Sequence, residues 1–315
     1  MNWSALLRRR LAVVAVSLHN GVTLVRLEPG VNGGKPLLRV ARRRVELSAL
    51  RRWSRKGFLS NALLVLVLPA EMRTITHVAK PETPDAEVVS ALRWQIANSL
   101  DYPAEEALID AIDLPILATG QAPQMMAISA RASLVKKYME PLLDLGLTPD
   151  VIDIQDQGIR NLSLLAAPAS AARACVWLRG TNALITIIAG AELCQTRAME
   201  MGDTAQNAEG VADRLSLQLQ RTLDAFDRQA THYAVRYMHL LPNHHGPALA
   251  DALNAHLTIK CLSLDFAQLF DMSRLLPDRL QSDPEDLVDC LGTAAGRLAA
   301  FDELVQTSLQ SEVSA

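Results

Sequence analysis

The chain has 315 residues, half of them hydrophobic and 21% charged, so it can bury a sizeable core without disulfides or a structural metal. This composition excludes a disordered chain, and an aromatic content of 4% without a heptad or glycine period argues against aromatic-rich barrels, coiled coils and collagen. The net charge is −3, but the first 60 residues hold 13 Lys and Arg against Glu28 and Glu46, which leaves 18 against 32 in the remaining 255. An α/β domain, or two related ones, remains.

The longest apolar runs, residues 61–70 and 182–191, are far shorter than the ~20 residues of a membrane-spanning helix. The apolar stretch before Arg8 is too short for a signal peptide, whose positive charges come first. We therefore expect a cytoplasmic protein. Four widely spaced cysteines form no CxxC pair and are expected to be small buried hydrophobes rather than disulfide or zinc residues: Cys175, Cys194, Cys261 and Cys290.

The first elements are predicted to be strands. Residues 11–30 contain two β-branched runs on either side of a polar tip at Leu18 to Gly21, which is the pattern of a hairpin. A third strand is expected near Leu37 to Val40. Residues 63–69 are apolar on both faces, which predicts a strand at the centre of a covered sheet, ending at Pro69.

A helix is expected to begin at Thr83 and Pro84, through side-chain capping and the fixed φ of proline, and to run to about Leu100. Trp94 projects from the face opposite its apolar stripe, where it could pack under a loop or line a groove. The stripe comprises Val88, Val89, Leu92, Ile96 and Leu100.

The next segment predicts a short strand and a helix from Ala132 to Leu145, with Gly146 as its C-cap, before residues 148–154 return as a strand. A stretch containing Pro and Ala at Pro168 to Ala172 separates this half from the next.

The second half opens as the first does. Residues 174–200 predict three strands joined by a polar turn and a turn at Gly190, and a long amphipathic helix follows from Glu209 to Ala230. A strand, a helix at Pro247, a short strand and a final helix after Pro284 complete the pattern. Two similarly built halves indicate an internally duplicated α/β protein.

This order of elements resembles the actin-like ATPase superfamily, and in particular the PilM/MshI-type cytoplasmic proteins of type IV pilus (including MSHA pilus) biogenesis. The most specific part is residues 86–115, which look like the family's helix, Tyr/Pro turn and acidic strand. Residues 125–154 are similar to its strand, helix and returning strand, and residues 286–298 to its closing helix. The resemblance spans nearly the whole chain.

The resemblance implies an actin-like (ribonuclease H-like) duplicated α/β fold with a small inserted subdomain. Its implied parts are a first actin-like subdomain, an inserted subdomain, a return to the first, a second actin-like half and a C-terminal helix that packs back on the first, at residues 1–75, 76–130, 131–172, 173–283 and 284–315.

It also implies a non-catalytic adaptor that binds the cytoplasmic N-terminal peptide of a bitopic inner-membrane PilN-like partner, in a groove between the first and inserted subdomains. Such an adaptor is peripheral on the inner-membrane face, and pairing with a second copy is left open. The candidate groove residues are Trp94, Ile96, Tyr102 and Pro103.

A working actin-like ATPase needs two glycine-containing hairpin tips that approach the phosphates, with an acid at each to hold Mg²⁺. Here Val16 and Trp177 stand where the family has these acids. A slip of one residue places Ser17 at the first acid and Gly180 at the second glycine, so ATP and Mg²⁺ binding stays open as the alternative. Otherwise we expect no catalytic residue, no cofactor and no metal. The degenerate positions are Val16, Leu18, His19, Asn20, Trp177, Arg179, Gly180, Thr181, Leu241, Pro242 and Asn243.

Two other features have simpler interpretations. The histidines His239, His244 and His245 suggest a metal site, but no acid or cysteine joins them at ligand spacing, so loop polarity is favoured. The basic segment fits a solvated face or docking on an anionic membrane leaflet better than nucleic acid, because aromatic interleaving is limited to Trp53 and Phe58. Its cations are Arg8 to Arg10, Arg42 to Arg44, Arg51, Arg52, Arg55 and Lys56.

Overall fold

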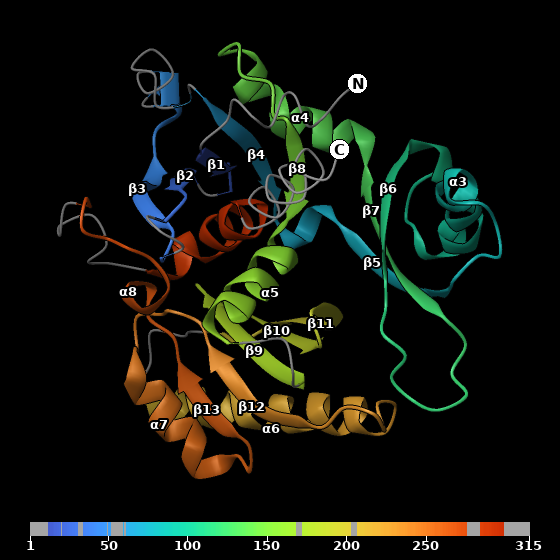
Figure 1. Cartoon of the computed structure of the whole chain (residues 1–315), viewed down its shortest axis with the longest axis vertical. Coiled ribbons are helices and arrows are strands. Elements are labelled where there is room, and N and C mark those ends of the chain that lie inside the picture. Colours follow the sequence, from blue (N-terminus) through green and yellow to red (C-terminus); the bar gives the residue numbers. More distant parts are fainter. Residues whose placement is uncertain are drawn as a thin grey trace, which may run out of the picture.

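The computed structural model contains three β-sheets whose arrangement is shown in Figure 1. Two five-stranded sheets form the body of the molecule, and a three-stranded sheet stands beside the first of them. The structure describes residues 12–19, 21–30, 34–48, 50–51, 59, 61–167, 172–202, 207–275 and 284–298.

The first sheet has the strand order β3-β2-β1-β4-β8. Strands β1, β2 and β3 form an antiparallel meander, and β4 and β8 continue the sheet in parallel with β1. All seven residues of β4 are buried, which confirms the prediction of a covered central strand. Its members are β1 (Ala12–Ser17), β2 (Val22–Glu28), β3 (Leu37–Val45), β4 (Ala62–Leu68) and β8 (Val151–Ile154).

The second sheet repeats this topology in the order β11-β10-β9-β12-β13. Again the first three strands are antiparallel and the last two run parallel to the first of them. The predicted internal duplication is confirmed. Its strands are β9 (Ala172–Arg179), β10 (Asn182–Ala189), β11 (Glu192–Glu200), β12 (Val235–Leu240) and β13 (Lys260–Ser263).

The third sheet lies between β4 and β8 in the sequence and has the antiparallel order β5-β7-β6. Helix α3 covers one of its faces through Leu92 and Ile96, which are fully buried against the sheet. A short 3₁₀ turn (Ala70–Met72) leads into it, and two more (Ala97–Ser99 and Ala104–Glu106) connect α3 to β6. Its members are β5 (Thr74–Ala79), α3 (Asp85–Ile96), β6 (Ala107–Asp113) and β7 (Gln124–Arg131).

The remaining helices cover the sheets or connect them. Helix α6 buries an apolar stripe on the second sheet, as predicted. A 3₁₀ turn (Pro284–Leu287) opens the final helix, which is described over residues 288–298. The others are α4 (Ala132–Leu143), α5 (Gln155–Ala166), α6 (Ala208–Asp227), α7 (Pro247–His256) and α8 (Phe266–Leu269).

Four details of the predicted helices need correction. Pro84 is the N-cap of α3 and no side chain caps the helix, so the capping by Thr83 is wrong, and the α-helix ends at Ile96 rather than near Leu100. Val89 is 41% exposed and lies outside the buried stripe. Helix α4 ends at Leu143, although Gly146 closes it with φ = 72° as expected.

Helix α5 joins the two halves and was not predicted. It crosses the final helix so closely that a Cβ on Gly292 would lie 1.9 Å from the carbonyl oxygen of Gly158. The two backbones are therefore in contact at glycine, which only residues without a side chain permit. The predicted linker at 168–172 is described only at its last residue.

Candidate functional sites

The tips of the first hairpins of the two halves face a cleft of about 730 Å³. The two positions at which the resemblance places metal-holding acids are occupied by Val16 and Trp177. Both side chains belong to the hydrophobic core and are 0% and 2% exposed. The Trp177 indole Nε1 donates a hydrogen bond of 2.9 Å to the backbone carbonyl of Glu285, at the start of the final helix. The second tip is thus fastened to the chain's own C-terminal segment.

Arg179 strengthens this connection. Its guanidinium lies 5.4 Å from the centre of the Trp177 ring, and its nitrogens approach Asp289 at 3.3 Å and Asp286 at 3.7 Å. Burial raises the pKa of Asp289, and the Arg179 charge opposes that shift. The two carboxylates are neutralised from inside the protein.

Of the other predicted nucleotide positions, His19, Arg179, Gly180 and Thr181 line the cleft. The Leu18 backbone N–H donates to the Tyr138 hydroxyl at 2.8 Å. Asn20 lies outside the described residues. The remaining three positions, Leu241, Pro242 and Asn243, are buried and are not among the described residues that line the cleft.

These residues do not fit a magnesium triphosphate. The two positions expected to carry acids hold buried apolar side chains, and Pro242, another of the predicted nucleotide positions, has no N–H to donate. Glu71 and Glu200 line the same cleft. Among the described residues, no group of three or more His, Cys, Asp or Glu could hold a metal ion.

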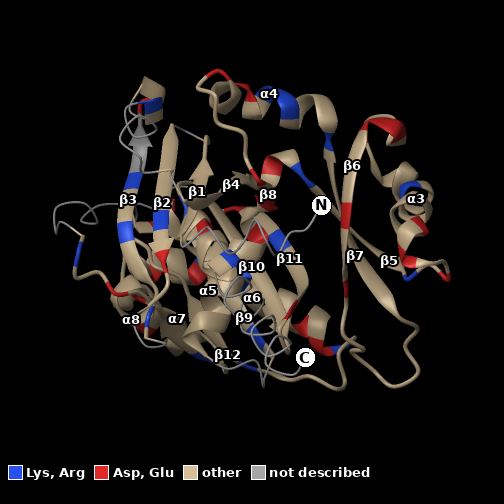
Figure 2. Cartoon of the chain, turned by 45° about the horizontal axis from the view of Figure 1, so that its top comes forward, with Lys and Arg blue, Asp and Glu red and all other residues tan. Residues whose placement is uncertain are grey.

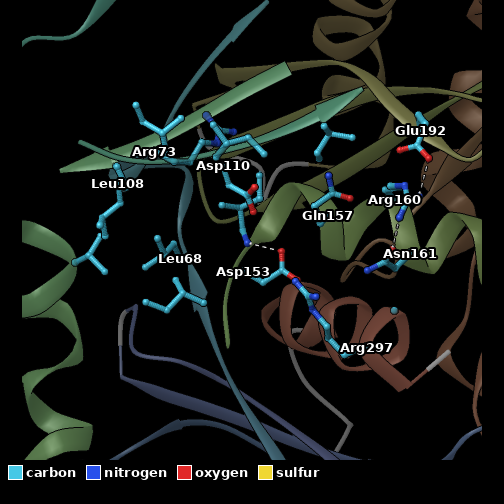
Figure 3. A pocket seen from close by; sticks show the side chains of 18 residues that line it. Leu68, Arg73, Leu108, Asp110, Asp153, Gln157, Arg160, Asn161, Glu192 and Arg297 are labelled. Atoms are coloured by element: carbon cyan, nitrogen blue, oxygen red, sulfur yellow. Dashed lines mark hydrogen bonds and ion pairs between the residues drawn. The ribbon is translucent and has the colours of Figure 1, made fainter. Parts of the chain in front are cut away.

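A second cavity, of about 480 Å³, lies between the three-stranded sheet and the first five-stranded sheet (Figure 3). Successive strand residues point to opposite faces, so Ile109 and Ala111 pack toward α3 while their neighbours on β6 face this cavity. Val135 of α4 packs against Ile128 and Ala130 on that second face, and the β6 residues beside them face the cavity. The wall that this face forms includes Leu108, Ile112, Ile128 and Ala130.

The opposite wall comes from the end of the first sheet, where Leu68, Ile152 and Ile154 line the cavity. Strand β8 is the edge strand there, since its ladder pairs only with β4 in the described chain. Helix α5 and the final helix provide the remaining boundary. Leu108 and Ile152 are 48% and 39% exposed, so two large apolar side chains from facing walls are open to solvent. We call this cavity the intersheet groove.

Arg73, which precedes β5, connects the groove with the cleft because it lines both. Its guanidinium donates to both oxygens of the fully buried Asp156, at 2.9 and 2.6 Å. The Thr196 hydroxyl of β11 donates to the same carboxylate at 2.7 Å. The Asp156 carboxylate on α5 thus links the segment that enters the third sheet with strand β11 of the second.

The four residues predicted for partner contact are not among the described residues that line the groove. Trp94 is 81% exposed on α3, on the other side of the inserted sheet, whereas Ile96 is fully buried beneath that helix. The Tyr102 ring lies 5.8 Å from the Arg131 guanidinium, and Pro103 precedes a 3₁₀ turn. A role in partner contact stays a prediction for them, and it is the alternative to docking in the groove. The groove-lining strand did carry a signal, because residues 107–113 are apolar on both faces while one helix is available to cover them.

The predicted cysteines and histidines are buried or hydrogen-bonded within the protein. All four cysteines are buried and unpaired, as expected, and burial raises the pKa of Cys175 to about 11. His239 contacts the Ser163 hydroxyl at 3.0 Å, and burial lowers its pKa to about 4. His244 contacts Glu285 at 3.0 Å. Within the described residues, no helix combines the length and apolar character needed to cross a bilayer.

No protein-family model matches the sequence, and no curated protein matches it. A solved structure described as the PilM-PilN type IV pilus biogenesis complex matches with a TM-score of 0.66 and 18% identity, over 92% of this chain and 99% of that chain. The cytoplasmic domain of EpsL, from the type II secretion system of Vibrio cholerae, matches at 0.46 and 13% identity, over 73% and 80%. A Bacteroides thetaiotaomicron protein with an actin-like ATPase fold and unknown function matches at 0.48 and 10% identity, over 84% and 94%. The first likeness shows a shared fold, and the predicted class is confirmed: an actin-like duplicated α/β fold with an inserted subdomain.

Proposed function

We propose that the chain is an adaptor of a type IV pilus assembly machine, and that it binds an extended peptide segment of a PilN-like partner in the intersheet groove. The observation that carries this proposal is the apolar part of the inserted sheet that lines the intersheet groove, opposed by the apolar edge of β8 across about 480 Å³. The choice of partner is supported by the solved structure with the same fold, which is a complex of PilM with PilN.

The dimensions of the groove favour a peptide over a folded domain. Its volume holds a few side chains, and its walls are the face of one sheet and the edge of another. An extended segment can lay alternate side chains against such a wall while its backbone approaches the free edge of β8. Covering Leu108 and Ile152 removes apolar surface from water, at roughly 25 cal/mol per Å².

The finer parts of this function are proposals as well. The partner segment is the cytoplasmic N-terminal peptide of a bitopic inner-membrane protein, which would hold the adaptor at the cytoplasmic face of that membrane, and the machine is of the MSHA type. Most cations of the basic segment lie outside the described residues, and Figure 2 places β3, which carries Arg42, on the opposite side of the molecule from the inserted subdomain.

Substituting Ile152 by arginine is expected to abolish partner binding. A charged side chain on the edge of β8 would occupy the groove and be buried by any apolar segment entering it, at a cost of several kcal/mol. Because Ile152 is 39% exposed, the melting temperature should change little. Binding of the labelled N-terminal peptide of the PilN-like partner, followed by fluorescence anisotropy, measures the effect.

Trp94→Ala is the matched control, since it removes a large exposed side chain on the far side of the inserted sheet. It should leave both peptide affinity and melting temperature nearly unchanged. If Trp94→Ala weakened capture and Ile152→Arg did not, docking would lie on α3 and the groove assignment would be wrong.

We further propose that the chain performs no ATP hydrolysis. The support is chemical: Val16 and Trp177 cannot ligate Mg²⁺, and both are held in the core. Phosphate release from Mg·ATP by the purified chain should equal that of a heat-treated sample. Turnover above that control would favour the alternative of an ATP-binding or weakly hydrolysing member, for which the open cleft of about 730 Å³ between the tips is the favourable observation.

A further inference from the structure

The charged residues that line the intersheet groove are almost all neutralised within the protein (Figure 3). Arg73 is paired with Asp156, Arg297 approaches Asp153 at 2.7 Å, and Arg160 approaches Glu192 at 3.5 Å. These pairs leave the groove without a strong preference for ligand charge at their positions.

Asp110 is the exception. It lies on β6, and its Oδ1 accepts a hydrogen bond from the adjacent Ala111 N–H at 2.8 Å. No cation among the described residues lies within 4.0 Å of its carboxylate, whereas the acids at both ends of the same strand region are paired, Glu106 with Arg131 and Asp113 with Lys80.

The surroundings of Asp110 are apolar. Strand alternation places it on the same face as Leu108 and Ile112, and the β6–β7 register puts Ile128 directly opposite. All four line the groove. An unpaired carboxylate at the centre of an apolar wall is tolerated while water reaches it, and Asp110 is exposed in the free chain.

A ligand that covers this wall removes the water that solvates the Asp110 carboxylate. A wholly apolar segment would strip water from Asp110 and leave a buried charge without a partner, which opposes binding. A segment with a basic side chain at that point gains a charge-assisted hydrogen bond in the same place. We infer that the intersheet groove selects an extended peptide in which an Arg or Lys, flanked by apolar residues, pairs with Asp110. This inference rests on the proposed peptide-binding function and specifies its ligand.

The test is a selection of displayed random dodecapeptides on the immobilised full chain, with removal of those that also bind the Ile152→Arg variant. Groove-dependent peptides should be enriched in Arg or Lys among apolar residues. The same selection on Asp110→Asn should lose that enrichment, and on Asp110→Lys it should shift to Asp or Glu. Asp113→Asn is the matched control, because that residue lies on the same strand but on the other face and pairs with Lys80; its selection should resemble that of the unmodified chain.

Affinities of individual selected peptides measure how much the pairing with Asp110 contributes to binding. Replacing the selected Arg by Gln should weaken binding to the unmodified chain about tenfold, which corresponds to about 1.4 kcal/mol, and should have little effect with Asp110→Asn. Groove-dependent peptides without an enriched cation would overturn this inference and leave the peptide-binding function standing. A selection that yields no groove-dependent peptide at all would overturn both.

Discussion

Replacing Gly292 by alanine is expected to lower the free energy of unfolding by about 3 kcal/mol. The added Cβ would lie 1.9 Å from the carbonyl oxygen of Gly158, and both atoms belong to helix backbones that cannot rotate away. Helix α5 and the final helix would have to separate, which disturbs the core shared by the two halves. Equilibrium unfolding in urea measures the loss.

Gly296→Ala provides the comparison, four residues along the same helix. Its Cβ would meet the side-chain amide of Asn161 at 2.0 Å, and the end of a side chain can move where a backbone cannot. The loss there should be about 1 kcal/mol. Equal losses at the two positions would show that the helices do not cross on their glycines.

Arg179→Met is expected to destabilise the fold by roughly 3–5 kcal/mol near neutral pH. Asp289 is 1% exposed, and Arg179 at 3.3 Å is its cationic neighbour, so the substitution leaves a buried carboxylate without a counter-charge. Arg197→Met is the control, because that exposed arginine bonds only to Gln218 and Thr222 among the described residues, and its loss should cost less than about 1 kcal/mol.

The loss of stability caused by Arg179→Met should also depend on pH. Burial already raises the pKa of Asp289, and removing Arg179 takes away the largest influence that lowers it. A carboxyl group whose pKa is higher in the folded than in the unfolded state stabilises the fold at pH values below the unfolded-state pKa. This stabilisation is lost as the pH rises through the folded-state pKa. The difference in unfolding free energy between the variant and the unmodified chain should therefore be larger at about pH 8 than at about pH 4. A difference independent of pH would mean that Asp289 is not the group left unpaired.

Most strands and helices could be predicted, because β1 and β2 are apolar runs rich in β-branched residues and the apolar residues of α6 recur with a helical period. Strand β5 was not predicted. Helix α5 escaped because its buried face includes Gln155, Asp156 and Ser163, which interrupt the apolar stripe. It also follows β8 without a loop, and its N-cap residue Ile154 has no capping side chain. Polar residues that are buried to join subdomains resemble a solvated turn in the sequence.

The two sites differed in how much the sequence revealed. The absence of an acid at Val16 and Trp177 could be read from the sequence because each residue lies in the first strand of a recognisable hairpin. The groove could not be predicted from the sequence. Its walls come from β6 and β8, which are about 40 residues apart and are brought together by tertiary packing. Trp94 was predicted as a groove residue because it is a large aromatic side chain opposite the apolar stripe of its helix. The sequence does not show which face of the sheet that helix covers.

The inserted sheet begins and ends on neighbouring strands, with Thr74 of β5 opposite Ser129 of β7. The chain thus departs from the duplicated frame and rejoins it at almost the same point, and the frame's own hydrogen-bond ladders run between other strands. Substitutions at the exposed positions of the insert can accordingly accumulate without disturbing the frame's ladders, whereas Met126 is buried in the frame's core and is constrained by it. Ligand choice could therefore change through the solvent-facing residues of this appendage while the duplicated frame keeps its fold.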